Sequence, residues 1–259
     1  MPELPDLEVF SINLTKALKG KKLVNVNVLQ AKKLNVTVNE FTDVLQGQFI
    51  AGVIRSGKHL HFKFKNGTVL GLHLMLHGQL HWFEKENENK YTIVELYFDG
   101  GTSLALTDFQ RQATPTLNPE KAQSPDALDK EVNLKFWKDT LQKSKSVIKT
   151  ILMDQHVVRG IGNAYADEIL YNACLSPFSI ANKIPDDHIK ILDKSIRKVL
   201  MDAVKEIIKA RPDIISGELR DFFQVHRPKM KTTPSGAIIL QKPLASRKTY
   251  YTEEQKLFN

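Results

Sequence analysis

Residues 159–168, Arg-Gly-Ile-Gly-Asn-Ala-Tyr-Ala-Asp-Glu, decide how the second half of the chain folds. Gly160 and Gly162 predict a tight turn, and Asn163 is a typical N-cap of the helix that we expect over 164–173. The free amides at the start of that helix, together with the Asn163 side chain, could bind a phosphate. A glycine turn before a helix is common and usually structural, and here the two interpretations are compatible.

Helical patterns surround this motif. Val147, Ile148, Ile151 and Leu152 form one apolar face. The acidic start at 185–187 begins a long helix with an apolar stripe, which comprises Ile189, Leu192, Ile196, Val199, Leu200, Ala203 and Ile207. We therefore predict a helical domain over 134–221, followed over 222–259 by a basic segment with a hairpin whose strands are 237–240 and 248–251.

The first half of the chain has strand patterns. A helix is predicted over 7–18, ending at Gly20, and alternating segments such as 24–28 and 60–64 follow it. Asn66-Gly67 is typical of a tight turn between strands. Residues 1–113 are thus expected to form one helix and an antiparallel β-sandwich, and the proline-bearing stretch 114–133 a linker. The fold class is α+β.

Composition narrows the setting of the chain. It has 259 residues, a formal net charge of +8, and no acidic residue between Phe222 and Thr252. Such a basic surface is typical of a polyanion partner, although a solvated cationic face would give the same net charge. The single cysteine, Cys174, excludes an internal disulfide and is expected to be buried in a helix. Without a signal peptide or a long apolar run, we expect no membrane contact and a cytoplasmic location.

The N-terminus, Met-Pro-Glu-Leu-Pro-Asp-Leu-Glu, suggests covalent chemistry. Removal of Met1 would leave Pro2 with a free secondary amine, and α-amino groups have a pKa of about 7.7–8.0. Such an amine can attack an electrophilic sugar carbon and form an iminium, with Glu3 close enough to move protons. The alternative is that Pro2 and Pro5 only shape the start of a helix.

These motifs together resemble the formamidopyrimidine-DNA glycosylase / endonuclease VIII family, which has a helix–two-turns–helix DNA-binding domain. The likeness covers the N-terminal motif, residues 148–155 and residues 160–168, in the family's order. It implies that Pro2 is the nucleophile and Glu3 the proton shuttle. It also implies that Lys58 and Asn163 contact DNA phosphates, although a solvated lysine at a strand end would explain Lys58 equally simply.

The C-terminal hairpin departs from the family pattern. Most members carry a zinc finger, but the equivalent positions here are Thr232, Ser235, Thr252 and Gln255, which are not zinc ligands. The chain resembles a zincless-finger variant in which Arg247 takes the place of the phosphate-binding arginine. Five histidines lie between positions 59 and 81, but their spacing repeats no ligand pattern. We therefore expect no metal and no cofactor.

Two loops and one missing insert bear on substrate choice. The resemblance places Met75, Leu76 and His77 in the loop that fills the gap left by a flipped base. In the second such loop, Gln110 and Gln112 replace an arginine and a phenylalanine. The insert that covers an oxidised purine is absent between Phe222 and Val225, and Asp6 replaces the usual glutamate. These departures favour the endonuclease VIII type.

The resemblance implies a monomeric base-excision-repair DNA glycosylase with AP lyase activity, acting on damaged double-stranded DNA in the nucleoid. The expected substrates are oxidised pyrimidines and abasic sites. Two alternatives stay open: a damaged-DNA-binding protein without catalysis, and an AP lyase with little glycosylase activity.

Overall fold

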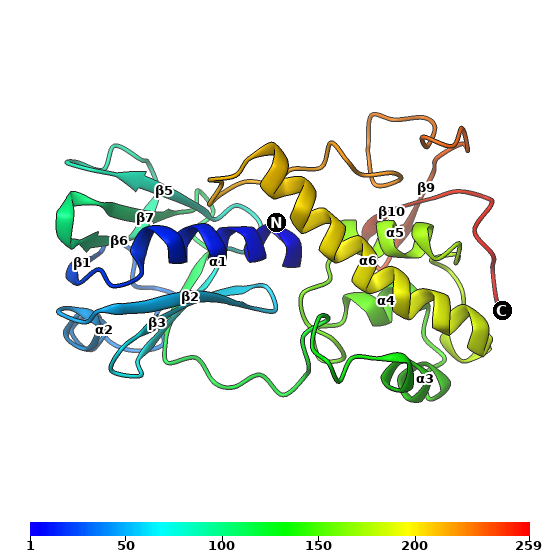
Figure 1. Ribbon diagram of the computed structural model, residues 1–259, viewed down its shortest axis with the longest axis horizontal. Helices are drawn as coiled ribbons and strands as arrows, with labels where there is room; N and C mark the ends of the chain where they lie inside the picture. The colour runs from blue at the N-terminus through cyan, green and yellow to red at the C-terminus, as the bar shows by residue number, and fades with distance from the viewer. The chain divides into compact units, whose positions relative to one another are not determined.

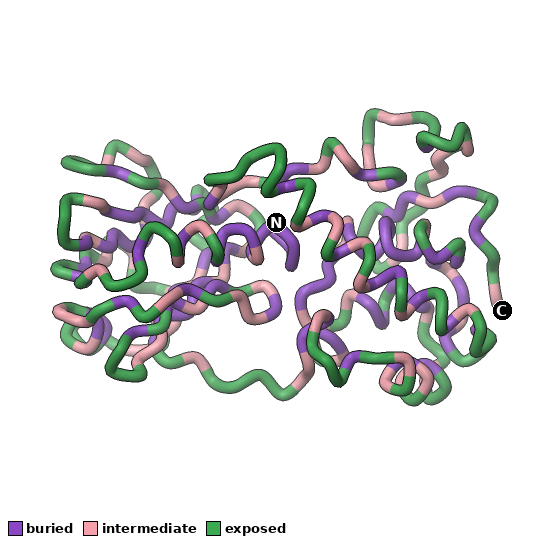
Figure 2. The backbone as a smooth tube through the Cα atoms, viewed as in Figure 1, coloured by how far each residue is buried: buried purple, intermediate pink, exposed green.

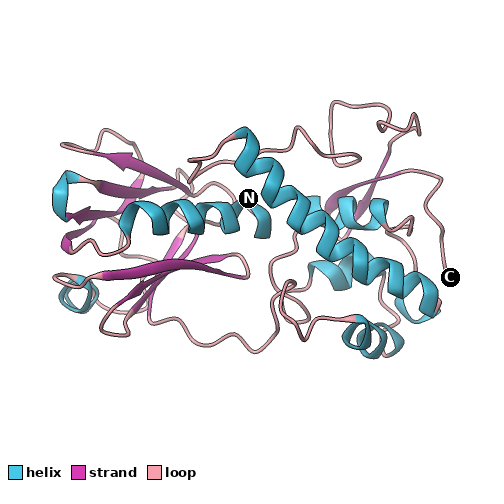
Figure 3. Cartoon of the chain, in the orientation of Figure 1, coloured by secondary structure: helices cyan, strands magenta, loops and turns pink.

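The computed structural model describes residues 1–259 and divides them into two compact units. The first unit comprises Met1–Lys121 and Ile207–Glu218, and the second comprises Ala122–Glu206 and Leu219–Asn259. Strands dominate the first unit and helices dominate the second (Figures 1 and 3). The predicted α+β class is confirmed, including the C-terminal hairpin. No helix has both the length and the apolar character needed to cross a membrane.

The first unit is a sandwich of two four-stranded antiparallel sheets, with strand orders β1-β6-β7-β5 and β2-β3-β4-β8. Alternating apolar residues place one face of each sheet in a shared core. The strands are β1 (Leu23–Val28), β2 (Ile50–Ser56), β3 (His59–Phe64), β4 (Val69–His73), β5 (Gln79–Phe83), β6 (Thr92–Phe98), β7 (Ser103–Thr107) and β8 (Thr114–Leu117). The helical elements are α1 (Leu4–Leu18), α2 (Val38–Leu45) and the single turn η1 (Asp99–Gly101).

Helix α1 packs against β2 and carries a fully buried apolar face (Figure 2). Leu7, Phe10, Leu14 and Leu18 recur at helical spacing and join the core of the sandwich. The Thr15 hydroxyl binds the backbone of Val53, accepting its N–H at 2.8 Å and donating to its carbonyl at 2.7 Å. These contacts fix the helix, and with it the N-terminus, against the sheet.

Residues 207–218 complete the first unit although they come late in the chain. Ile215 is buried in the sandwich core. The Asn13 amide donates to the Ile214 carbonyl at 2.8 Å, and the Ser216 hydroxyl accepts the Leu80 N–H at 3.0 Å. A C-terminal segment is therefore an integral part of the N-terminal core.

The second unit consists of short helices, most of the long helix α6, and a hairpin. The turn at Gly160–Gly162 leads directly into α5, as the sequence predicts. The elements are α3 (Leu134–Gln142), α4 (Ile148–Met153), α5 (Asn163–Asn172), η2 (Ala181–Lys183), α6 (Asp186–Ala210), β9 (Leu240–Leu244) and β10 (Arg247–Tyr251). Strands β9 and β10 pair antiparallel.

Some local features differ from the sequence-based expectations. Residues 114–117, expected in the linker, form strand β8 and pair with β4. Cys174 is exposed and lies beyond α5 with a left-handed φ of 51°, so the prediction of a buried helical cysteine is wrong. Gly162, which has an extended backbone, is the N-cap of α5, and Asn163 is the first helical residue, with its side chain bonded to the Lys248 carbonyl of the hairpin. The first hairpin strand starts at Leu240, three residues later than its predicted start at Ala237.

Candidate functional site

Pro2 and Glu3 lie at the buried start of α1. Glu3 is the N-cap residue and only 4% exposed. The Asp6 carboxylate, itself 1% exposed, accepts the Glu3 N–H at 2.9 Å and forms a capping box with it. Asp6 therefore helps to fix the backbone that carries Pro2 and Glu3.

A second carboxylate faces the N-terminus. The α-amino group of Met1 donates a hydrogen bond to Glu218 Oε1, in the late segment that completes this unit. Sequence reasoning did not single out Glu218, because 217 residues separate the two partners. Loss of Met1 would leave this carboxylate near the new terminus at Pro2.

Lys58 lies in the turn between β2 and β3, next to Gly57 with a φ of 60°. Arg55 holds this turn to α1: its Nε donates to the Glu8 carboxylate at 2.8 Å, and its Nη1 donates to the Gly57 carbonyl at 3.2 Å. The ion pair between Arg55 and Glu8 thus joins the turn with Lys58 to helix α1, which begins two residues after Pro2.

Loop 74–78, between β4 and β5, is a closed turn that exposes Leu76. The Gly78 N–H donates to the Leu74 carbonyl at 2.7 Å, and a Cβ at Gly78 would lie 2.2 Å from that oxygen, so only glycine fits. Met75 has a left-handed φ of 53°. Leu76, at the turn's tip, is 57% exposed. The loop presents an apolar side chain on a constrained backbone.

His73 connects loop 74–78 to the Lys58 turn. Its Nδ1 accepts the Met75 N–H at 3.0 Å, and its ring lies 4.5 Å from that of His59 on the paired strand. Burial and then the positive charge of Lys58 lower the pKa of His73 from 6.5 to about 4. The imidazole is therefore neutral at physiological pH, as its acceptor role requires.

Loop 108–113 is organised around the buried carboxylate of Asp108. This carboxylate accepts the N–H groups of Gln110 at 2.9 Å, Gln112 at 2.8 Å and Ala113 at 2.8 Å. Phe109 is 57% exposed, and its ring lies 4.5 Å from that of His77 in loop 74–78. The prediction from sequence concerned Gln110 and Gln112 of this loop and did not include Phe109, although Phe109 is the aromatic residue that the fold exposes.

In the second unit, a buried ion pair joins α4, α5 and the hairpin. Lys149 Nζ lies 2.7 Å from Asp167 Oδ1, with side chains 1% and 0% exposed, and donates to the Thr249 hydroxyl at 2.8 Å. Asp167 Oδ2 lies 2.7 Å from His226 Nδ1 and accepts the Tyr250 N–H at 3.0 Å. We call these five residues the Lys149–Asp167 network.

The network lies next to the two residues expected to bind phosphate in this unit. Asn163 Nδ2 donates to the Lys248 carbonyl at 3.0 Å, which holds the start of α5 beside β10. Arg247 is exposed at the start of β10, after a two-residue turn at Ala245 and Ser246 with φ of 48° and 61°. The structure thus brings Asn163 and the strand that carries Arg247 together.

Polar side chains fasten the ends of the finger segment. The Thr233 hydroxyl accepts the Ala237 N–H at 3.1 Å and lies 2.8 Å from that of Ser235. Gln255 Oε1 accepts the Thr252 N–H at 2.8 Å, and its Nε2 donates to the Leu175 carbonyl at 2.9 Å. These bonds close turns at both places where the family pattern would have zinc ligands, with Thr233 in place of Thr232.

No three side chains among His, Cys, Asp and Glu are grouped so that they could hold a metal ion. The histidines of the sheet have other contacts. His81 Nε2 lies 3.1 Å from the Thr107 hydroxyl, while His73 and His77 contact the loops described above.

Comparison with known families places both units. Residues 1–114 match the formamidopyrimidine-DNA glycosylase N-terminal domain, and residues 124–211 match the formamidopyrimidine-DNA glycosylase H2TH domain. Together these matches cover most of the chain.

Similar proteins and structures agree with these matches. A formamidopyrimidine-DNA glycosylase of Streptococcus mutans is 31% identical, covering 87% of this chain and 88% of the relative. One from Listeria monocytogenes is 33% identical, covering 79% and 78%. The structure of Lactococcus lactis Fpg in complex with abasic-site DNA superimposes with a TM-score of 0.86 at 25% identity, covering 97% and 98% of the two chains. A MutM complex with DNA containing carbocyclic 8-oxo-G gives a TM-score of 0.86 at 26% identity, with the same coverage.

Proposed function

The chain belongs to the formamidopyrimidine-DNA glycosylase family of base-excision-repair enzymes, and from this premise we propose that it is a bifunctional glycosylase and AP lyase with Pro2 as its nucleophile. The observation that carries the proposal is the buried start of α1, where Pro2 directly precedes the N-cap residue Glu3. Removal of Met1 would give Pro2 a secondary amine in a fixed position.

The chemistry follows from that amine. Its lone pair attacks C1′ of the damaged nucleotide, and the bond from C1′ to the base breaks so that the base leaves with the electron pair. The amine gives up its proton, and its lone pair then opens the sugar ring: the bond from C1′ to O4′ breaks, O4′ takes up a proton, and the iminium forms. Loss of a proton next to the iminium then eliminates the 3′ phosphate and cuts the strand. Glu3 is the proposed carrier of these protons, since it is adjacent to Pro2.

We assign DNA binding to cations and amides in both units, with damaged double-stranded DNA as the substrate and a monomer as the active form. Lys58 is the phosphate contact of the first unit, and Asn163 and Arg247 those of the second. Asn163 Nδ2 has a second proton beyond the one that it gives to Lys248, so it can donate to a phosphate without losing the hairpin. The net charge of +8 favours association with DNA, and we expect the protein at the nucleoid.

Base flipping is assigned to loop 74–78, with Leu76 as the residue that enters the stack and Met75 and His77 at its sides. Extruding a base costs a few kcal/mol, least for a damaged pair. An exposed leucine on a backbone that only glycine can close is suited to fill the gap.

We propose a preference for oxidised pyrimidines and abasic sites over 8-oxoguanine. The support is the short path from Phe222 to Val225. The Glu168 carboxylate accepts the N–H groups of Gln224 at 2.9 Å, Val225 at 2.9 Å and His226 at 2.7 Å, which ties this path to α5. Such a path leaves no loop to cover a purine.

Borohydride trapping tests the nucleophile. Processed protein incubated with abasic-site DNA and borohydride should form a covalent adduct that maps to the N-terminal peptide. A variant with one residue added before Pro2 has no secondary amine, only a displaced primary amine, and should trap far more slowly, whereas Lys58→Gln should still trap when DNA is saturating. An adduct on a lysine, or none with protein shown by intact mass to begin at Pro2, would contradict the proposal.

Single-turnover excision of 5-hydroxyuracil, thymine glycol and 8-oxoguanine tests the substrate preference separately. We expect both pyrimidine lesions to be excised faster than 8-oxoguanine opposite cytosine. The reverse order would show that the missing loop does not select the substrate. Cleavage of abasic sites alone would identify a lyase without glycosylase activity.

A further inference from the structure

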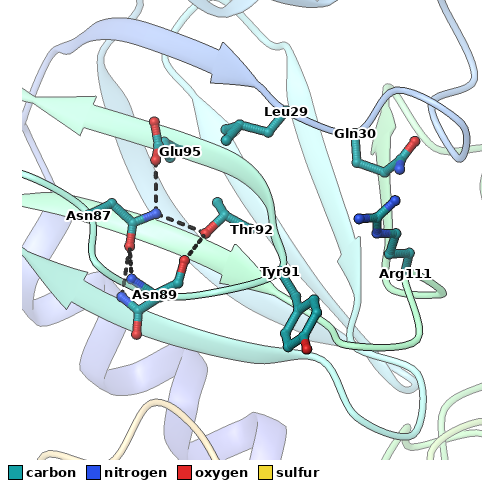
Figure 4. Close-up of a pocket in the computed structure, with 8 residues that line it drawn as sticks. All are labelled: Leu29, Gln30, Asn87, Asn89, Tyr91, Thr92, Glu95 and Arg111. Atoms are coloured by element: carbon teal, nitrogen blue, oxygen red, sulfur yellow. Dashed lines mark hydrogen bonds between the residues drawn. The ribbon is translucent and has the colours of Figure 1, made fainter.

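A pocket of about 320 Å³ in the first unit has no part in the chemistry above (Figure 4). Its volume is within the range of small-molecule and nucleotide sites, at roughly 300–1,000 Å³. It is lined by Leu29, Gln30, Asn87, Asn89, Tyr91, Thr92, Glu95 and Arg111. The lining comes from the end of β1, the segment before β6, β6 itself and loop 108–113.

The floor of the pocket is a fixed polar network. Glu95 is 6% exposed and accepts hydrogen bonds from Asn27 at 2.8 Å, Asn87 at 2.8 Å and Tyr97 at 2.8 Å. Asn87 also donates to the Thr92 hydroxyl at 2.9 Å, which uses both of its amide protons. Burial acts to raise the pKa of Glu95, but the three hydrogen-bond donors together outweigh burial and lower this pKa, so the floor is negatively charged at neutral pH.

The rim offers groups that the protein leaves open. Tyr91 is 55% exposed, and Arg111 is exposed with no carboxylate in contact. Gln30 Nε2 and Asn89 Oδ1 have no partner within the protein, so they supply one donor and one acceptor to the lining that also holds Tyr91. Figure 4 shows Arg111 beside Gln30, with Tyr91 on the same side of the pocket.

The pocket lies at the same end of its sheet as the two loops proposed to meet the DNA. Strand β5 begins at Gln79, directly after loop 74–78, and pairs there with Thr107 at the end of β7. Thr107 also pairs with Thr92 at the start of β6, and the Tyr91 carbonyl accepts the Asp108 N–H at 3.0 Å. Tyr91 and the base of loop 108–113 are therefore in direct contact.

The backbone is constrained at the rim as it is in the loop. Tyr91 and Arg111 have left-handed φ values of 60° and 55°, close to the 53° of Met75. Non-glycine residues rarely adopt this conformation, and such outliers gather at ligand-contacting sites. Both residues are exposed and line the pocket.

We infer that this pocket, which we call the Tyr91–Arg111 pocket, binds a second nucleotide of the bound DNA, with the base against Tyr91 and the phosphate on Arg111. The inference rests on the proposed function, because it is the DNA held at loop 74–78 that would bring a nucleotide here. An aromatic ring that shares a pocket with an amide donor and an amide acceptor is suited to receive an unstacked base.

The charges fix which way round the nucleotide lies. The negative floor at Glu95 repels a phosphate and attracts the amino groups of a base, so the base must point inward. The segment before Tyr91 carries three exposed carboxylates, but none of them lines the pocket: Glu84, Glu86 and Glu88. The lining residues of that segment are Asn87 and Asn89. Arg111 is the one cation that lines the pocket, and the phosphate must lie on its side.

A thermodynamic cycle on DNA binding tests the inference. The substrates are duplexes with an uncleavable tetrahydrofuran abasic site. Each duplex of the series lacks one additional base, and the position of that base varies along both strands around the site. At one position, removal should weaken binding of the wild-type protein about five- to a hundredfold, as expected for a stacked base. The same removal should leave the affinity of Tyr91→Leu unchanged, because this variant has no ring to stack on.

Matched variants separate the pocket from general effects. Phe49→Ala removes another exposed aromatic ring, directly before β2, and should keep the wild-type response. Arg111→Gln should reduce the magnitude of the slope of log affinity against log salt concentration by about 1, the change expected when one phosphate contact is lost. Thermal melting shows that each variant is folded, and the exposure of both side chains makes this the expected result.

The outcomes distinguish the two proposals. If wild-type protein binds the abasic duplex but no base removal distinguishes it from Tyr91→Leu, the inference about the pocket is wrong and the proposed glycosylase function is unaffected. No binding to the abasic duplex would overturn both. A third outcome concerns a free deoxynucleoside monophosphate. If its binding free energy equals or exceeds the free energy lost when the coupled base is removed from the DNA, the pocket is a small-molecule site and the DNA assignment is overturned.

Discussion

The two units hold their candidate DNA-binding residues by different means. In the first unit, loops 74–78 and 108–113 are closed by bonds between residues two to five positions apart. In the second unit, the Lys149–Asp167 network joins partners 59, 83 and 100 residues apart. The exposed loops are thus encoded locally, whereas the surface with Asn163 and Arg247 exists only when the whole unit is assembled. One substitution should therefore do most damage in the second unit.

Lys149→Met should have the largest effect, because it leaves the buried Asp167 carboxylate without its cation. We expect a loss of about 3–5 kcal/mol in the free energy of unfolding, measured by denaturant titration. Lys198→Met is the control, since Lys198 and Asp202 form an exposed pair at 2.8 Å that should contribute about 0.5 kcal/mol or less. Both lysines lie in the second unit, so equal effects of the two substitutions would show that the Lys149–Asp167 network does not hold this unit together.

Acid should weaken the first unit through His73. Its pKa is about 4 when folded and 6.5 in the unfolded chain, so the unfolded state binds more protons between these values. Stability from this group is complete above pH 6.5 and declines as the pH falls to 4, by up to roughly 3 kcal/mol. Melting curves of wild type and His73→Gln over this range isolate the effect, and parallel curves would show that His73 is not the titrating group.

Asp108→Asn tests how much a locally closed loop contributes. The amide retains one acceptor oxygen where the carboxylate serves three N–H groups, so we expect a loss of about 1–3 kcal/mol. Asp99→Asn is a suitable comparison, because Asp99 is exposed and its carboxylate accepts only one hydrogen bond, from the backbone N–H of Lys22 at 3.0 Å. A loss from Asp99→Asn as large as that from Asp108→Asn would remove the distinction.

Leu76→Ala should change stability least, within about 0.5 kcal/mol, because the side chain is 57% exposed. Its effect should instead be on excision, with a rate roughly tenfold lower as the gap in the stack is left unfilled. Leu257→Ala, at an exposed leucine of the second unit, should change neither quantity. An unchanged excision rate for Leu76→Ala would remove the proposed role of loop 74–78.

The sequence predicts the architecture well, because the helices and strands follow apolar periodicity. Helix α1, strand β3 and the start of α5 agree closely with the predicted ranges. Strand β8 was missed because Pro115 and its polar neighbours read as a linker, and only pairing with β4 makes them a strand. Apolar periodicity thus predicts elements with a regular buried face well, but it predicts a strand at the edge of a sheet, such as β8, poorly.

The candidate site was only partly accessible from the sequence. Pro2, Glu3 and Asn163 stand in motifs, so pattern alone singles them out. Glu218 and the Lys149–Asp167 contacts could not be foreseen, since their partners are remote in the chain. Phe109 was overlooked for another reason: its importance comes from exposure and from the ring of His77, neither of which is visible in a run of letters.

The late segment 207–218 has a consequence for synthesis. Because Ile215 and the partners of Asn13 and Leu80 lie in this segment, the N-terminal core is incomplete while only residues 1–121 have left the ribosome. A nascent chain exposes apolar surface on its sandwich until about four-fifths of the protein is made, a state in which domains are prone to aggregate. Stalled chains ending before residue 207 should therefore be captured by holdase chaperones more readily than chains that extend past residue 218.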